Sequence, residues 1–306
     1  MAKILIATEK PFAKIAVDGI KEVAKTAGLE VVLLEKYTEK AQLLAAVADV
    51  EAMIIRSDKI DNEVFDAAKN LKIVVRAGAG YDNVDLAAAT AHGVVVMNTP
   101  GQNSNAVAEL VFGMLVFAVR NFYNGKAGTE LKGKKLGILA YGNVGRRVAH
   151  IAKGFDMDVY AYDAYCPAAA IESDGVKAVS SQDELFEKCE VVSLHIPATA
   201  ETRQSINYAL VGKMPKGGVL VNTARKEVIN EPELLKLMQE RTDLKYVTDI
   251  MPEADADFRM LEGRYFSTPK KMGAQTAEAN INAGVAAAHQ IAAFFKDGCT
   301  KYQVNK

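Results

Sequence analysis

The stretch from Ala140 to Gly145 has the residue types and spacing of a pyrophosphate-binding turn. It follows a short apolar run that begins after Lys134, and it leads into a predicted helix that opens at Asn143. A chain that turns this sharply from strand to helix leaves backbone N–H groups and the positive end of the helix dipole open to an anion. The predicted contacts are Gly142, Asn143, Val144 and Gly145.

A carboxylate follows at the distance that a dinucleotide site requires. The predicted strand Val159–Tyr162 ends in Asp163, about twenty residues beyond Gly145. Such a carboxylate accepts hydrogen bonds from both ribose hydroxyls and repels a 2′-phosphate, so NAD is the expected cofactor. Ala140 stands where G-x-G-x-x-G has its first glycine. The alternative is an ordinary strand–turn–helix joint, which does not explain the position of Asp163.

Composition excludes several other classes of protein. The chain has 306 residues, enough for about two domains, with 50% apolar and 25% charged residues. A net charge of −1 gives no reason to expect a nucleic acid or membrane partner. The three cysteines form no metal-spaced pair, so no metal is expected, and reduced thiols fit a cytoplasmic protein. No apolar run is long enough for a signal peptide or a membrane span.

Strands and helices alternate along the chain, which predicts an α/β fold of doubly wound parallel sheets. The predicted strands are Ile4–Ala7, Val31–Leu34, Ala52–Ile55, Ile73–Val75, Val94–Met97, Val159–Tyr162, Val191–His195, Val219–Asn222 and Tyr246–Asp249. The predicted helices include Phe12–Lys25, Thr38–Val47, Ala106–Arg120 and Ala277–Lys296, the last ending at Gly298.

This pattern divides the chain into two predicted domains. Residues 99–276 contain the glycine turn and form the nucleotide-binding domain, while residues 1–98 and 277–306 form a smaller substrate domain. A small substrate is expected to meet the cofactor where two such domains face each other.

Five further stretches carry a resemblance to a known family. They are Ile55–Lys59, Val75–Asn83, Met97–Pro100, Ser193–Pro197 and Val221–Arg225. With the glycine turn, they make the chain similar to the D-isomer-specific 2-hydroxyacid dehydrogenases, closest to the short D-3-phosphoglycerate dehydrogenase branch. The resemblance implies NAD-dependent hydride transfer and a Rossmann domain inserted in a flavodoxin-like substrate domain.

The resemblance also implies a homodimer joined through the nucleotide domain. The predicted helix Ala106–Arg120 is apolar nearly all round, as expected for a helix that packs against a second subunit. The alternative is a core helix that is buried within a single chain.

Arg225 is the predicted catalytic arginine. A guanidinium after the buried strand Val219–Asn222 can hold a carboxylate through two hydrogen bonds and polarise the substrate's C2 oxygen. The small-residue turn Gly78-Ala79-Gly80 lets backbone N–H groups approach the carboxylate closely, and the family uses this loop for substrate and nicotinamide contact. The resemblance extends the cofactor contacts to His195, Ile196, Pro197, Thr223, Ala224, Arg225 and Asp249. His195 is expected to be structural rather than catalytic.

A loop in the first domain suggests a phosphorylated substrate. Arg56, Ser57 and Lys59 follow a predicted strand, and two cations with a hydroxyl suit a dianionic phosphate. The alternative is solvated loop charge.

The family's Pro-His acid/base and its supporting glutamate are both missing. Counting back from Met272 puts Lys271 at the histidine's place, whereas counting forward from Pro269 puts Lys270 there. The glutamate position holds Ala254, with Glu253 one residue away. A free lysine has a pKa of about 10.4, and burial near a second cation would lower it.

These departures leave two classes of function open. One is an active dehydrogenase with a lysine acid/base, most readily oxidising D-3-phosphoglycerate to 3-phosphohydroxypyruvate in serine biosynthesis. Its enzymatic alternative is a glyoxylate/hydroxypyruvate or other 2-ketoacid reductase. The other class is a catalytically inactive, NAD-binding regulatory protein.

Overall fold

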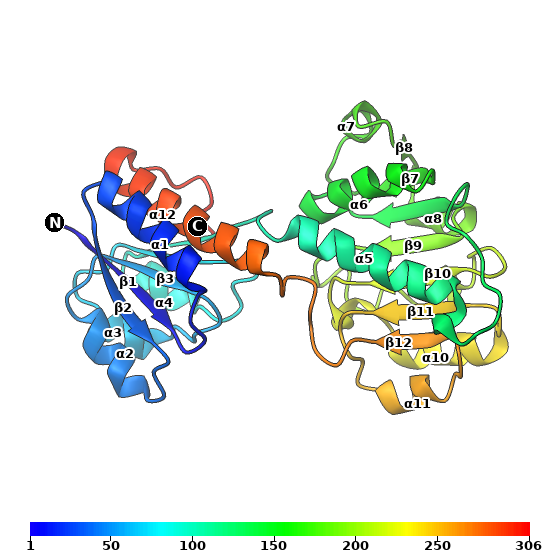
Figure 1. Ribbon diagram of the computed structural model, residues 1–306, viewed down its shortest axis with the longest axis horizontal. Coiled ribbons are helices and arrows are strands. Elements are labelled where there is room, and N and C mark those ends of the chain that lie inside the picture. Colours follow the sequence, from blue (N-terminus) through cyan, green and yellow to red (C-terminus); the bar gives the residue numbers. More distant parts are fainter. The chain divides into compact units, whose positions relative to one another are not determined.

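The computed structural model describes residues 1–306, which divide into two compact units (Figure 1). Unit 1 comprises Met1–Asn103 and Gln275–Lys306, and unit 2 comprises Ser104–Ala274. These boundaries lie a few residues from those predicted at 98/99 and 276/277, and each unit is a parallel-sheet α/β structure.

Unit 1 contains a five-stranded parallel sheet in the order β2-β1-β3-β4-β5. This is the flavodoxin-like strand order. The strands are β1 Lys3–Thr8, β2 Glu30–Glu35, β3 Ala52–Ile55, β4 Ile73–Arg76 and β5 Val95–Asn98. The helices are α1 Lys14–Thr26, α2 Lys40–Val47, α3 Asn62–Ala67, α4 Leu86–Ala91 and α12 Ala277–Asp297.

Both faces of this sheet are covered, which is why its strands read as continuous apolar runs. On β1, Ile4 and Ile6 join the core beneath α1 and α12. The alternate residues Leu5 and Ala7 join the core beneath α2, α3 and α4. The period of two along one strand therefore supplies both layers.

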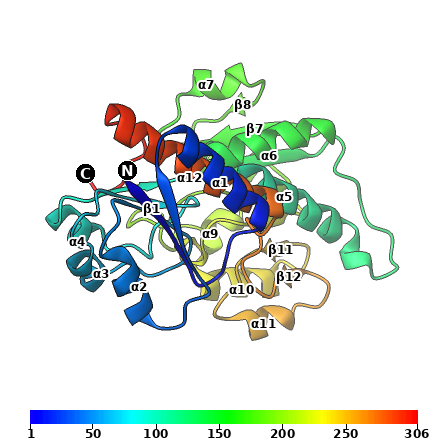
Figure 2. The same ribbon diagram turned by 60° about the vertical axis from the view of Figure 1, so that its left-hand side comes forward.

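The last helix returns to the first domain, as the sequence predicts. Thr276 caps α12 by accepting a hydrogen bond from the Ala279 N–H at 3.1 Å, and Gly298 ends it in the left-handed region at φ 64°. Helix α12 packs alongside α1, as two views of unit 1 show (Figure 1, Figure 2). The predicted helix and its stop are confirmed.

Unit 2 contains a seven-stranded parallel sheet in the order β12-β11-β10-β9-β6-β7-β8. The strands are β6 Lys135–Leu139, β7 Asp158–Tyr162, β8 Lys177–Ala178, β9 Val191–Leu194, β10 Val219–Asn222, β11 Lys245–Thr248 and β12 Tyr265–Ser267. The helices are α5 Ser104–Val119, α6 Asn143–Gly154, α7 Ala168–Ser173, α8 Gln182–Lys188, α9 Tyr208–Val211, α10 Glu231–Glu240 and α11 Asp255–Arg259, with short 3₁₀ turns at Asn121–Tyr123 and Lys226–Val228.

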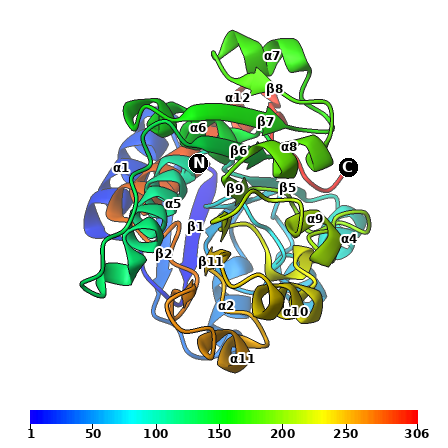
Figure 3. The same cartoon turned by 90° about the vertical axis from the view of Figure 1, so that its right-hand side faces the viewer.

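Helices cover both faces of the unit 2 sheet as well. Helices α5 and α6 cover one face, while α8, α9 and α10 cover the other (Figure 3). The strand order reverses between β6 and β9, which is the switch point where doubly wound folds bind nucleotides beyond the carboxyl ends of the strands. The predicted fold class is confirmed.

Helix α5 is buried by its own chain. Ten of its residues are buried, and it packs on α6, β10 and β11. Its apolar composition is therefore accounted for within one copy, and the helix no longer argues for a dimer. No helix of the protein is both long and apolar enough to cross a lipid bilayer.

Candidate active site

The glycine turn joins β6 to α6 in the predicted position. Helix α6 begins at Asn143, and its N-cap residue, Gly142, offers no side chain to the first turn. A Cβ on Gly145 would lie 2.4 Å from the Ala140 carbonyl oxygen, so only glycine allows this close approach. The open N–H groups of the first turn are therefore available to an anion.

Ala140 accounts for the missing glycine of the motif. Its φ is +78°, in the left-handed region that glycine normally occupies. The turn therefore keeps the glycine geometry without the glycine, and the alanine bears the steric cost.

Asp163 lies directly beside the turn. It follows β7, and its Oδ2 accepts a hydrogen bond from the Tyr141 N–H at 2.6 Å. Its Oδ1 accepts from the N–H groups of Tyr165 and Cys166, at 2.7 and 2.8 Å. Three backbone donors thus fix this carboxylate at the carboxyl edge of the sheet, where a ribose hydroxyl would reach it.

Arg225 and Lys271 meet at one carbonyl oxygen. Arg225 Nη1 donates to the Ala224 oxygen at 2.9 Å, and Lys271 Nζ donates to the same oxygen at 3.1 Å. Both lysines are exposed, so the burial expected of the base is not seen. Lys270 is engaged only through its carbonyl, which accepts from the Thr268 hydroxyl at 2.9 Å. Of the two lysines that the sequence left open, the structure brings Lys271 to the arginine.

Asp249 holds the segment that carries Lys271. This carboxylate follows β11 and is fully buried. Its Oδ1 accepts from the Thr268 hydroxyl at 3.0 Å and the Met272 N–H at 2.7 Å, and its Oδ2 accepts from the Gly273 N–H at 2.7 Å. The resemblance predicts that Asp249 contacts the nicotinamide. In the structure, its two oxygens accept hydrogen bonds from residues 268–273.

The displaced glutamate forms an ion pair away from Lys271. Glu253 Oε1 lies 2.8 Å from Lys226 Nζ, and the Glu253 side chain is 81% exposed. Ala254 and Glu253 donate their N–H groups to the two oxygens of Glu231, which the sequence analysis did not single out. The family's glutamate position thus carries no carboxylate.

His195 fits the structural role expected of it. Its Nε2 lies 2.9 Å from the Ser193 hydroxyl, and burial lowers the pKa of His195 to about 3. The ring is therefore neutral at physiological pH. Ile196 and Pro197 follow it beyond the carboxyl end of β9.

In unit 1, Arg56 is committed to protein acceptors. Its Nη1 donates to the carbonyls of Lys10 and Pro11, at 2.9 and 3.1 Å, and its Nη2 donates to Asn280 Oδ1 at 2.7 Å. The guanidinium also lies over the Phe12 ring at 5.3 Å, and burial lowers the pKa of Arg56. Arg56 therefore ties β3 to the 10–11 loop and α12, while Ser57 and Lys59 are exposed.

Sequence reasoning missed the buried Asp58, which organises this loop. It accepts hydrogen bonds from the Tyr37 hydroxyl at 2.9 Å, the Glu9 N–H at 2.8 Å and the Arg56 N–H at 3.1 Å. The sequence signal was its position between Ser57 and Lys59. A carboxylate beside predicted phosphate ligands would repel the phosphate, which indicates a structural role instead.

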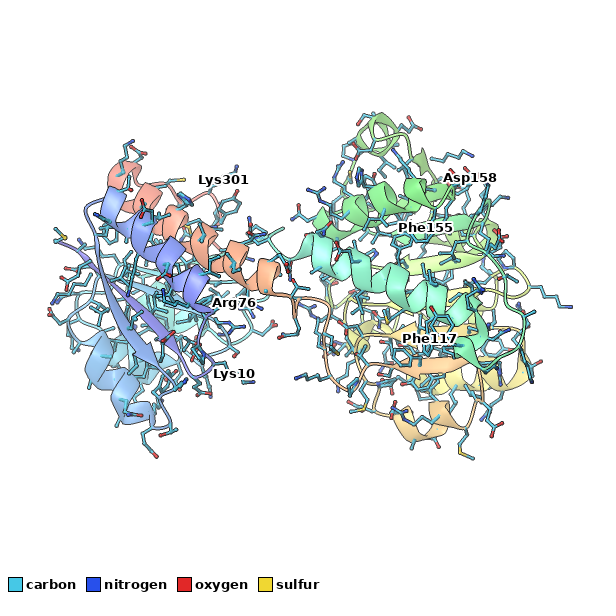
Figure 4. All side chains as sticks on the ribbon, in the orientation of Figure 1. Lys10, Arg76, Phe117, Phe155, Asp158 and Lys301 are labelled. Atoms are coloured by element: carbon cyan, nitrogen blue, oxygen red, sulfur yellow. The ribbon has the colours of Figure 1, made fainter.

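Arg76 is a second residue that the sequence analysis did not single out. It ends β4, and its Nε donates to the Arg56 carbonyl at 2.9 Å. Its Nη1 would lie 1.5 Å from a Cβ on Gly78, whose φ is +148°, so the guanidinium packs against the Gly78–Gly80 loop. Figure 4 places Arg76 and Lys10 at the same end of unit 1.

Comparison with known proteins gives the family. Residues 113–266 match the model of the NAD-binding domain of D-isomer specific 2-hydroxyacid dehydrogenases. The chain belongs to the D-isomer-specific 2-hydroxyacid dehydrogenase family. Unit 2 is its NAD-binding domain, as the glycine turn and Asp163 predicted.

Individual relatives agree with this assignment. This chain is 49% identical to the NAD⁺-bound 3-phosphoglycerate dehydrogenase of Entamoeba histolytica, covering 100% of this chain and 99% of that one with a TM-score of 0.87. It is 34% identical to a hydroxypyruvate reductase of Thermotoga maritima, over 86% of this chain and 90% of the relative. A D-3-phosphoglycerate dehydrogenase of Methanocaldococcus jannaschii is 35% identical over 82% of this chain, which spans only about half (51%) of that relative.

The residues of the dehydrogenase fit the dinucleotide on a further observation. Thr223, directly after β10, has a buried hydroxyl with no hydrogen-bond partner. A buried polar atom without a partner is costly, and a cofactor bound at this edge would supply one. The residues that would hold NAD at this edge are Gly142–Gly145, Asp163 and Thr223.

Replacing the strained alanine should stabilise the dehydrogenase. Ala140→Gly relieves a left-handed conformation worth roughly 1–2 kcal/mol and adds unfolded-state entropy worth about 0.5–1 kcal/mol, so a net gain of about 0.5–1 kcal/mol is expected. Urea denaturation followed by circular dichroism measures it. Ala169→Gly, on the exposed surface of α7, should instead cost about 1 kcal/mol. An equal loss of unfolding free energy in the two variants would show that the left-handed conformation of Ala140 carries no strain.

Removing one acceptor oxygen of the buried Asp249 carboxylate should lower both the stability of the protein and its kcat. In Asp249→Asn the amide nitrogen faces a backbone N–H, which leaves a buried donor unsatisfied at a cost of about 1–3 kcal/mol. Thermal unfolding and kcat are measured together. Asp257→Asn, an exposed acid in α11, serves as the control and should change neither. Wild-type stability and kcat in Asp249→Asn would show that the carboxylate is dispensable.

Proposed function

We propose that the protein oxidises D-3-phosphoglycerate to 3-phosphohydroxypyruvate with NAD. The observation that carries the proposal is the meeting of Arg225 Nη1 and Lys271 Nζ at the Ala224 oxygen, in the NAD-binding unit. An alcohol oxidation needs a cation beside the reacting oxygen and a group that takes its proton. These two side chains supply both.

Each side chain has a defined task in this reaction. A bound NAD would supply the acceptor for the hydride of the substrate's C2. Arg225 binds the substrate carboxylate and offers an N–H to the C2 oxygen, where negative charge develops. The neutral amine of Lys271 takes the hydroxyl proton as the C2–O bond becomes a carbonyl. In the reverse direction, the Lys271 ammonium returns that proton.

The surroundings of Lys271 suit a base. A nearby carboxylate would stabilise the ammonium form, whereas a nearby guanidinium disfavours it. Arg225 is a neighbouring cation, because its Nη1 and Lys271 Nζ donate to the same Ala224 oxygen. Ala254 carries no charge, and Glu253 is paired with Lys226.

The phosphate of the substrate is supported by the relatives and by unit 1. The Entamoeba histolytica relative is named a 3-phosphoglycerate dehydrogenase, and Arg56 and Arg76 lie together where β3 and β4 end. The Thermotoga maritima relative favours a second candidate, the reduction of hydroxypyruvate. A homodimer and a cytoplasmic location stay predictions of the same proposal.

Lys271→Met should remove most of kcat. Without the base, the loss should fall in the range of about 10²–10⁴-fold that general acid–base groups contribute. Lys270→Met is the matched control, because it removes the same charge one residue away. Hydroxy-acid oxidation by the wild type should rise toward alkaline pH, and this rise should disappear in Lys271→Met. Tight NADH binding in both variants confirms that the fold is intact. Normal turnover in both would rule out a lysine base.

Arg56→Ala should discriminate between substrates with and without a phosphate. A lost charge-assisted hydrogen bond is worth roughly 1.5–3 kcal/mol, or about ten- to a hundredfold in kcat/KM for 3-phosphoglycerate. D-glycerate should be affected little. Because Arg56 also binds Lys10, Pro11 and Asn280, thermal stability is measured alongside. Equal losses with both substrates would make Arg56 structural.

A substrate panel separates the remaining readings. Phosphorylated and unphosphorylated 2-hydroxy and 2-keto acids are assayed with NAD(H) and NADP(H). Preference for hydroxypyruvate would favour the reductase. Tight NAD binding without turnover of any acid would establish the regulatory, inactive alternative.

A further inference from the structure

A cavity of about 290 Å³ lies at the amino edge of the unit 2 sheet, opposite the edge that carries the glycine turn. It is lined by the residues just before or at the start of β6, β9, β10 and β11, together with the segment that follows α5. Because all strands of this sheet are parallel, their amino ends share one edge. The lining side chains with charge are Lys134, Lys216, Lys245, Glu190 and Asp243.

Two of the three lysines present ammonium groups that no protein group engages. No ion pair or hydrogen bond engages the ammonium groups of Lys134 and Lys216. Lys245 Nζ donates to the Ala118 carbonyl at 2.7 Å and to Asn121 Oδ1 at 2.8 Å, both neutral acceptors. Lys245 is also half-buried, and this burial lowers its pKa.

The two carboxylates of the cavity are used elsewhere. Glu190 Oε2 accepts the Lys135 backbone N–H at 2.8 Å. Asp243 receives two hydrogen bonds from the Arg241 guanidinium, at 2.8 and 2.7 Å, and one from the Gly217 N–H at 2.8 Å. The three lysines and Arg241 outnumber these two carboxylates, so the charged groups at the cavity keep a net positive charge.

Asn121, which lines the cavity, begins a strained turn of the backbone. Asn121, Phe122 and Tyr123 all have φ between 52° and 54°, a left-handed run that non-glycine residues rarely adopt. Asn121 bridges this run to Lys245 and donates its Nδ2 to the Ala127 carbonyl at 2.8 Å. Phe117, which Figure 4 labels toward the carboxyl end of α5, packs on Phe122 and Tyr123.

We propose that this cavity binds a small dianion, either a phosphate or a dicarboxylate. Three ammonium groups favour a compact ligand with two negative charges over a monovalent one. The volume lies at the lower end of the range for small-molecule sites, so the ligand is far smaller than a dinucleotide. The site is separate from the NAD turn, because it lies at the opposite edge of the same sheet.

Inorganic phosphate is the probe for a calorimetric titration of the NADH-loaded protein at fixed ionic strength. Loading with NADH blocks the pyrophosphate site. Phosphate should bind with saturation at one site per chain, and Arg225→Met, which removes the proposed catalytic anion contact, should retain this binding. Malonate in a parallel titration separates the two ligand sources. Binding of both defines a dianion site, whereas binding of phosphate alone defines a phosphate site.

The paired variant Lys134→Met/Lys216→Met should weaken the binding at least tenfold. Lys245 is left intact because it caps α5. The control is Lys132→Met/Lys236→Met, which removes the same two charges outside the cavity and should bind phosphate within twofold of the wild type. NADH affinity should be unchanged in both. Absence of saturable phosphate and malonate binding in the wild type would overturn the proposal, as would equal weakening in the two paired variants.

Discussion

The position of the proposed base depends on one buried carboxylate. Asp249 is fully buried, and an ionised group in that environment is tolerated only when donors surround it. Two backbone N–H groups and one hydroxyl, all from residues 268–273, provide them. The requirement works in both directions, because satisfying the carboxylate fixes the backbone on both sides of Lys271. Without these hydrogen bonds, the position of Lys271 Nζ beside the Ala224 oxygen would not be fixed.

The register of two neighbouring strands places Arg225 close to the segment that Asp249 fixes. Strands β10 and β11 are parallel neighbours, with Asn222 opposite Thr248. The segments that leave them therefore emerge side by side at the carboxyl edge, one leading to Arg225 and the other to Asp249. Asn222 supports the same edge, since its side chain binds the Ala224 N–H and the Arg225 carbonyl. The Ala224 oxygen that receives both cations is thus fixed from two strands. Because the strands are parallel, their amino ends share the opposite edge, where Lys134, Lys216 and Lys245 lie.

The sequence predicts the parts of the molecule that depend on local pattern. Strands buried on both faces read as apolar runs, so the predicted strands lie within a residue or two of the observed ones, and Asp163 was placed from spacing alone. The short strands β8 and β12 were not predicted. Partner choice between distant residues was not predictable. Arg56 stays a predicted phosphate ligand beside Ser57, but its hydrogen bond to Asn280, more than two hundred residues away, could not be predicted from the local pattern. Lys270 and Lys271 are adjacent in the sequence, and only Lys271 Nζ reaches the Ala224 oxygen. The hydrogen bonds of Asp249 to residues 268–273 fix the backbone there, and residue spacing could not predict them.

The displaced glutamate is connected to a second departure from the family pattern, at Lys226. Lys226 replaces a glycine beside Arg225, and Glu253 lies one residue from the family's glutamate position; the two form an ion pair. An exposed pair of this kind is worth only about 0–1 kcal/mol, so its contribution to stability is small. Its consequence for the proposed chemistry is electrostatic. A histidine base gains from a carboxylate that stabilises its protonated form, whereas a lysine, already too basic, needs that carboxylate removed. Under the proposed function, a lysine at position 271 and an alanine at 254 are therefore mutually consistent.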